Sequence, residues 1–114
     1  MDATELILLY DYYGSLLTDR QKECFELRYN QDLSLGEIGQ ELGISRQGVF
    51  DNLSRTEALL KNMENKTGCV GRDRAYRKAM ENIQLVAKLL LESSDEHVRT
   101  LAQRIVDIAN VIEE

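Results

Sequence analysis

The chain of 114 residues contains no proline and no tryptophan, and it has one histidine and two cysteines. Without proline, only glycines and polar capping residues interrupt the chain, so we expect helices joined by short turns. His97, Cys24 and Cys69 are too few for a zinc site or for a cysteine–histidine catalytic pair. No glycine-rich phosphate loop is present either. We therefore expect no metal, no cofactor and no enzymatic activity, with two reduced thiols and His97 on a solvated helix face.

Long apolar runs are also missing from the sequence. No stretch approaches the ~18 consecutive apolar residues of a membrane span. The first residues, MDATE, are acidic and lack the basic start of a secretion signal. These two features predict a cytoplasmic protein without a membrane span.

Apolar residues recur at helical spacing along most of the chain, and no alternating strand pattern competes. Residues 4–17 carry an apolar arc wider than one stripe, which predicts a helix covered on two sides. Thr18 with Gln21, and Ser34 with Glu37, form capping boxes that begin two further helices. The sequence therefore predicts an all-α protein.

Residues 34–66 carry the pattern of a helix-turn-helix without a wing. Gly43 is placed to end a short helix in the left-handed conformation, and Ser45 to cap a helix running to about residue 66. Gly39 lies where the two helices approach closely. Their expected shared core consists of Ile38, Leu42, Ile44, Val49 and Leu53.

The C-terminal part predicts a helical hairpin after a loop framed by Gly68 and Gly71. Two heptad-like seams are expected to face each other: Tyr76, Met80, Ile83, Ala87 and Leu90, and Val98, Leu101, Ile105, Ile108 and Ile112. We expect a helix-turn-helix domain at residues 1–67 and a hairpin at 68–114 packed on it as one compact unit. A homodimer through the first helix or the hairpin also follows as a prediction.

The helix that begins after Ser45 offers candidate nucleic-acid contacts. Glutamine and asparagine hydrogen-bond adenine edges, and arginine binds guanine or phosphate. The candidate binding residues are Ser45, Arg46, Gln47, Asn52, Arg55 and Lys61. An ordinary helical corner with solvated polar residues is the alternative. Phe50 either meets a base or a protein partner, or packs against the C-terminal helices, and Asp51 repels phosphate.

The net charge of −6 is unevenly distributed. Residues 1–44 hold 3 basic and 9 acidic side chains, residues 45–78 hold 8 and 4, and residues 79–114 hold 3 and 7. The balances are therefore −6, +4 and −4. A basic block on the candidate helix is what phosphate binding needs, since phosphate neutralisation supplies most non-specific affinity.

Four segments, LTDRQ (17–21), LRY (27–29), SLGEIG (34–39) and GISRQ (43–47), resemble region 4 of bacterial sigma factors. The segment QGVFDNL (47–53) and the tyrosine-rich start resemble the YlxM family more specifically. The resemblance implies a sigma-region-4-like fold and a DNA-binding regulatory protein. Genes of that family typically lie beside the gene for the signal recognition particle GTPase, which implies a role in that protein-targeting pathway.

Two functions remain open from the sequence. The first is a regulator that binds DNA or RNA. The second is an adaptor that keeps the helix-turn-helix fold but binds a protein partner of the targeting machinery through Phe50 or the first helix.

Overall fold

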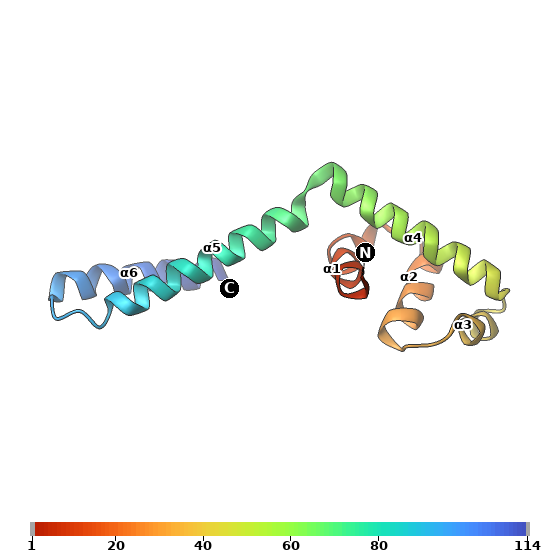
Figure 1. The fold of residues 1–114 in the computed structure, drawn as a ribbon, viewed down its shortest axis with the longest axis horizontal. Coiled ribbons are helices and arrows are strands. Elements are labelled where there is room, and N and C mark those ends of the chain that lie inside the picture. The colour runs from red at the N-terminus through yellow and green to blue at the C-terminus, as the bar shows by residue number, and fades with distance from the viewer. Residues whose placement is uncertain (1, 114) are drawn as a thin grey trace. The chain divides into compact units, whose positions relative to one another are not determined.

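The computed structural model describes residues 2–113, and these residues form helices and turns without a strand. The chain divides into two compact units, Met1–Val70 and Gly71–Glu114. The all-α prediction is therefore confirmed, whereas the packing of the hairpin on the first unit stays a prediction. Figure 1 shows the elements, which are α1 (Ala3–Tyr13), the 3-10 turn η1 (Gly14–Leu16), α2 (Asp19–Phe25), the π-helical turn η2 (Glu26–Asn30), α3 (Leu35–Leu42), α4 (Arg46–Thr67), α5 (Cys69–Leu90) and α6 (Glu96–Glu113).

In the first unit, α1, α2 and α3 all pack against α4. One core cluster lies towards the C-terminal end of α4 and contains Leu6, Leu9, Phe25, Leu60 and Val70 among its buried residues. Most of the wide apolar arc of α1 is used within this cluster, because Ile7, Leu8 and Tyr10 also pack against it, whereas Tyr12 is 50 % exposed.

Hydrogen bonds tie α1 to the start of α5 in the same cluster. The Tyr13 hydroxyl donates to a Glu64 carboxylate oxygen at 2.6 Å. The same oxygen accepts the Val70 backbone N–H at 3.0 Å. Burial and the Glu64 hydrogen bond raise the pKa of Tyr13. Both effects favour the protonated phenol, which is the form that donates to Glu64.

The second core cluster belongs to the helix-turn-helix. Cys24, Ile38 and Val49 are its buried residues, and burial raises the pKa of the Cys24 thiol. Leu42, Ile44 and Leu53 pack against it. The predicted core of this motif is confirmed, and α2 contributes to it through Cys24.

The loop predicted between Gly68 and Gly71 is wrong. Gly68 has φ 63 and is the C-cap of α4, while α5 begins at the next residue. The expected loop is therefore a single left-handed glycine, and Cys69 and Arg72 lie in a helix. A left-handed C-cap ends a helix in one residue, so a second glycine is not needed there.

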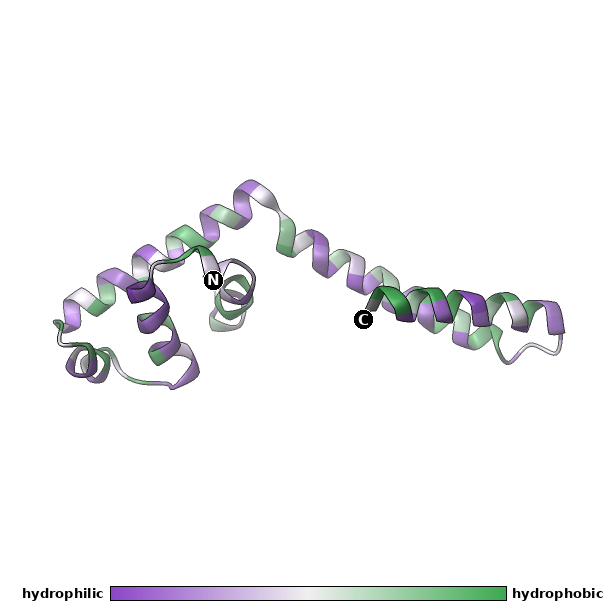
Figure 2. Ribbon diagram, turned by 180° about the vertical axis from the view of Figure 1, so that it is seen from behind, coloured by the Kyte–Doolittle hydropathy of each residue, from purple (hydrophilic) through white to green (hydrophobic). Residues whose placement is uncertain are grey.

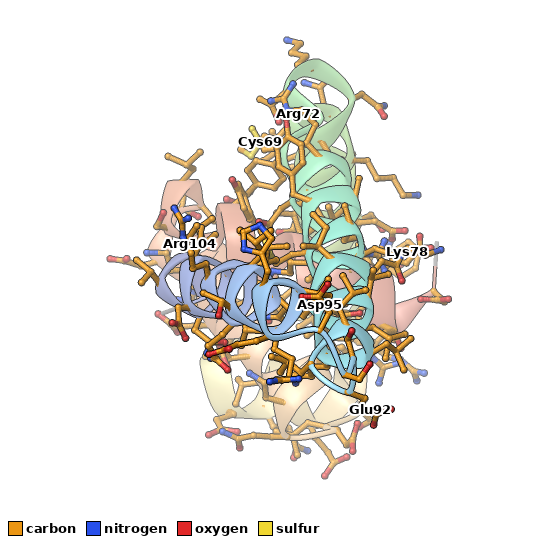
Figure 3. All side chains as sticks on the ribbon, turned by 90° about the vertical axis from the view of Figure 1, so that its left-hand side faces the viewer. Cys69, Arg72, Lys78, Glu92, Asp95 and Arg104 are labelled. Atoms are coloured by element: carbon orange, nitrogen blue, oxygen red, sulfur yellow. The ribbon has the colours of Figure 1, made fainter. Side chains whose placement is uncertain are left out.

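The second unit consists of most of α5, a turn and α6. Figure 3 shows Glu92 and Asp95 at the turn, from which α6 diverges from α5. The heptad seam predicted for α6 is wrong in register: its buried residues are Ala102, Val106 and Ala109. Ile105, Ile108 and Ile112 are 38 %, 61 % and 64 % exposed. Two helices cover little surface, so small side chains become fully buried and large ones do not.

The seam predicted for α5 is likewise largely exposed. Ala87 is its one buried residue, while Ile83, Leu90 and especially Tyr76 are exposed. Green hydrophobic positions recur along both α5 and α6 in Figure 2. The hairpin therefore carries a large uncovered apolar surface within the described structure.

The close approach at Gly39 generates a stability prediction. A Cβ at Gly39 would lie 2.7 Å from the Ile44 carbonyl oxygen, which is backbone of the turn. Gly39→Ala should therefore lower the free energy of unfolding by about 1–3 kcal/mol, as overpacking does. Urea unfolding followed by circular dichroism measures the change.

Gly36→Ala is the matched control on the same helix. A Cβ there meets its nearest atom, the Ser34 hydroxyl oxygen, only at 4.0 Å. This variant should keep its stability or gain about 0.5–1 kcal/mol from helix propensity. Equal stability losses in the two variants would contradict the close approach.

Candidate nucleic-acid interface

The helix-turn-helix is held by caps that the sequence predicts. At the start of α3, the Glu37 backbone donates to the Ser34 hydroxyl at 3.1 Å, and the Ser34 N–H donates to the Glu37 carboxylate at 3.0 Å. The backbone hydrogen bond from Ser34 holds the pKa of Glu37 below its usual range. Gly43, at φ 71, ends α3 in the left-handed conformation. These contacts fix where α3 begins and where it ends.

Ser45 occupies the N-terminus of α4. Its hydroxyl oxygen accepts the Gly48 N–H at 2.9 Å. The hydroxyl proton is left to donate, and Ser45 is exposed. The helix N-terminus also carries partial positive charge, so this end of α4 suits a phosphate oxygen.

The N-terminal half of α4 presents one continuous exposed face. At 100° per residue, Gln47 and Asp51 lie near the middle of this face, opposite the buried Val49. Arg46 and Arg55 lie at its two edges, and all four side chains are exposed. We call the exposed face formed by Ser45, Arg46, Gln47, Phe50, Asp51 and Arg55 the α4 face.

Gln47 already has one partner on this face. Its side-chain nitrogen donates to an Asp51 carboxylate oxygen at 3.0 Å. A base edge must therefore replace Asp51 as the acceptor, or use the remaining amide atoms. Asp51 adds a negative charge between the two arginines.

Phe50 is 52 % exposed. With Leu35, Arg46 and Gln47 it lines an open hollow between α3 and α4. The sequence assigns Leu35 neither to the motif's core nor to a binding surface, whereas in the structure it packs against the second cluster and also lines this hollow. No periodicity signal distinguishes the two roles, because a half-buried leucine fits both.

Asn52 and Lys61 do not join the α4 face. Asn52 is half-buried, and its side-chain oxygen is buried without a hydrogen-bond partner. Lys61 pairs with Glu57 at 3.0 Å, and it lies about 22 Å along the helix from Arg46. The structure therefore brings together Ser45, Arg46, Gln47 and Arg55 of the six predicted binding residues.

Residues 2–113 contain no group of three or more histidine, cysteine or acidic side chains placed to hold a metal ion. Over the same residues, no helix is long and apolar enough to cross a membrane. The candidate site consists of hydrogen-bonding, cationic and aromatic side chains.

The fold and the α4 face define a helix-turn-helix protein with a C-terminal two-helix extension. Residues 1–104 match the UPF0122 family, described as "Putative helix-turn-helix protein, YlxM / p13 like". The chain belongs to this family, which confirms the predicted resemblance to YlxM proteins.

Relatives from several bacteria match most of the chain. A UPF0122 protein of Thermoanaerobacter sp. (strain X514) is 43 % identical over 113 residues, covering 99 % of this chain and 95 % of the relative. One from Caldanaerobacter subterraneus subsp. tengcongensis is 49 % identical over 83 residues, covering 73 % and 71 %. One from Bacillus thuringiensis (strain Al Hakam) is 43 % identical over 106 residues, covering 92 % and 91 %.

Proposed function

We propose that this protein is a non-enzymatic regulator that binds nucleic acid through the α4 face. The observation that carries the proposal is the position of Arg46 and Arg55 at opposite edges of an exposed helix face with Gln47 between them. Arginines so placed can contact phosphates on either side of a groove while the glutamine meets a base edge. Membership of a helix-turn-helix family supports the same function.

The α4 face departs from a strongly basic recognition surface in two ways. Asp51 lowers the local positive charge, and Phe50 presents an apolar ring beside Arg46. We infer modest non-specific affinity, with Phe50 contacting a thymine methyl group or an unpaired base. RNA, which offers unpaired bases, is therefore a candidate ligand beside DNA.

The resemblance to YlxM proteins extends the proposal to the signal recognition particle pathway. That particle contains RNA, and both its RNA and bacterial DNA are in the cytoplasm, where we place this protein. An adaptor function is the second candidate, favoured by the exposure of the Phe50 ring. In that case Phe50 would contact a protein partner of the targeting machinery, and the chain would bind neither DNA nor RNA.

Arginine removal tests the binding function. Arg46→Ala and Arg55→Ala should each weaken binding to mixed-sequence duplex DNA, by about fivefold or more. Each should also reduce the slope of log affinity against log salt by ~0.9, the value for one lost phosphate contact. Fluorescence anisotropy titrations at several salt concentrations measure both quantities, with a structured RNA of equal length as a second probe.

Arg104→Ala is the charge-matched control, because Arg104 is exposed on α6. It should bind like the unmodified protein. If both α4 variants behave like Arg104→Ala, or if neither probe binds at low salt, the proposed function is wrong.

We further propose that two copies associate through the hairpin. The α1 option loses support, because Leu6, Leu9 and Tyr13 are buried within the first unit. The exposed apolar residues of the second unit that lie outside the Tyr76 end of α5 include Ile83, Leu85, Val86, Leu89, Leu90, Leu101, Ile105, Ile108 and Val111. Two more helices from a second copy would complete a four-helix arrangement around these side chains.

Light scattering tests the dimer. The unmodified protein should have twice the chain mass of 13.1 kDa at micromolar concentration. Val86→Asp and Ile108→Asp should shift it to a monomer, because an aspartate cannot be desolvated cheaply in an apolar interface. Leu16→Asp is the control, since Leu16 is 69 % exposed on the first unit. A monomeric unmodified protein would exclude the hairpin dimer.

A further inference from the structure

The first turns of α5 in the second unit carry a concentrated positive charge. Residues 71–78 contain four basic side chains and one acidic one, a balance of +3. The basic residues are Arg72, Arg74, Arg77 and Lys78, and all four are exposed. Figure 3 shows Arg72 near the start of α5 and Lys78 extending on the side of α5 away from α6.

An exposed aromatic ring lies in the middle of this basic segment. Tyr76 is 70 % exposed. It lines an open hollow together with Asp73, Arg77, Met80 and Ile112. Met80 and Ile112 supply an apolar floor contributed by both helices of the second unit. The hollow therefore combines an aromatic ring, two apolar side chains and the Arg77–Asp73 ion pair.

Most of the other aromatic rings of the chain are used in packing. Tyr10 stacks on Phe25 with ring centroids 4.1 Å apart, and Tyr29 lies against the same ring at 4.5 Å. Tyr13 is buried. Tyr76 has no such ring contact among the described residues, so packing does not account for an aromatic side chain here.

Arg77 is held beside this ring. Its Nε lies 3.2 Å from an Asp73 carboxylate oxygen, one helical turn earlier. The Arg77 side chain is 75 % exposed and that of Asp73 is 48 % exposed, so solvent screens the pair and it holds the guanidinium only weakly. A phosphate can therefore replace or share this partner. Arg72 lies four residues before Tyr76, on the same side of the helix.

Charge distinguishes this hollow from the proposed dimer surface. Interface cores are depleted in charged residues. The apolar residues of α5 from Ile83 onward fit that description, whereas residues 71–78 do not. A polyanion is the partner that the +3 segment fits.

We propose that Tyr76, Arg77 and the neighbouring basic residues form a second nucleic-acid site, which takes an unpaired base of a single strand. The base stacks on the Tyr76 ring above Met80 and Ile112, and the flanking phosphates contact Arg72 and Arg77. Stacking needs an exposed base face, which a duplex does not offer, so the site selects single strands over duplexes. This site lies on the second unit and is independent of the α4 face.

A tryptophan reporter tests the stacking directly. The chain has no tryptophan, so Tyr76→Trp places the only indole at the proposed site. Adding an unstructured single-stranded RNA or DNA oligonucleotide should quench its fluorescence saturably, whereas a duplex of equal length should quench it much less. Leu16→Trp, at an exposed position of the first unit, is the control and should show no saturable quenching.

Affinity measurements complete the test. Tyr76→Leu should weaken single-strand binding roughly 5- to 150-fold, the loss that one stacked base corresponds to, while Tyr76→Phe should bind normally. Comparing RNA with DNA of the same sequence shows which strand the site prefers. The proposal is overturned if Tyr76→Leu binds single strands as tightly as the unmodified protein, or if the indole of Tyr76→Trp stays unquenched at saturation.

Combined variants distinguish a failure of the proposed single-strand site from a failure of the α4 face. Adding Arg46→Ala or Arg55→Ala to the Tyr76→Trp reporter should leave its quenching by single strands unchanged, and Tyr76→Leu should leave duplex binding by the α4 face unchanged. Loss of the reporter's quenching in those α4 variants would show that the hollow is not a separate site and would also overturn the proposal.

Discussion

The buried side of α4 is the constraint on which the first unit depends. Val49, Thr56 and Leu60 are fully buried along it, and they are spaced so that one helix serves both core clusters. Val49 packs with α2 and α3, and Leu60 packs with α1. The Thr56 hydroxyl is satisfied by donating to the Asn52 carbonyl at 2.9 Å, so this polar residue costs little when buried. Because one side of α4 is committed to these contacts, the opposite side has to face solvent.

The packing of one side of α4 determines which residues form the α4 face. Gln47 and Arg55 remain exposed because they lie away from the buried stripe, and Arg46 is exposed as the first residue of α4. The Ser45 cap fixes where the helix begins. The close approach of Gly39 to the Ile44 carbonyl holds α3 near this N-terminus. The same geometry places Leu35 beside Phe50, which adds an apolar hollow to an otherwise polar face. The exposed side of α4 therefore carries the candidate binding residues, and its buried side carries the residues that pack in the core.

Local signals predicted the first unit well. Capping boxes at Thr18 and Ser34 and the left-handed Gly43 depend on neighbouring residues alone, so sequence spacing reveals them. The register of α6 was not predictable in this way. Its apolar residues cover more than one stripe, and the buried stripe consists of Ala102, Val106 and Ala109. Which stripe is buried depends on how much surface a partner covers, and periodicity carries no such information.

The candidate site was predictable only in part, because residue type and helical position are local signals whereas burial is not. Residue type and helical position indicated Ser45, Arg46, Gln47 and Arg55. Asn52 has suitable chemistry, but its position borders the buried stripe, and its side-chain oxygen faces inward. Its heptad spacing makes Tyr76 a predicted seam residue, because an aromatic residue at such a position usually packs. Its exposure is visible only in three dimensions.

If the exposed side of α4 is the surface that meets nucleic acid, its backbone amides should respond to the ligand. Amide chemical-shift mapping by NMR, during titration with mixed-sequence duplex DNA and then with RNA, tests this most directly. We expect the largest shifts on residues 45–55, decreasing as salt is added. Shifts confined to α2 or α6, or residues 45–55 unmoved at saturation with both ligands, would contradict it.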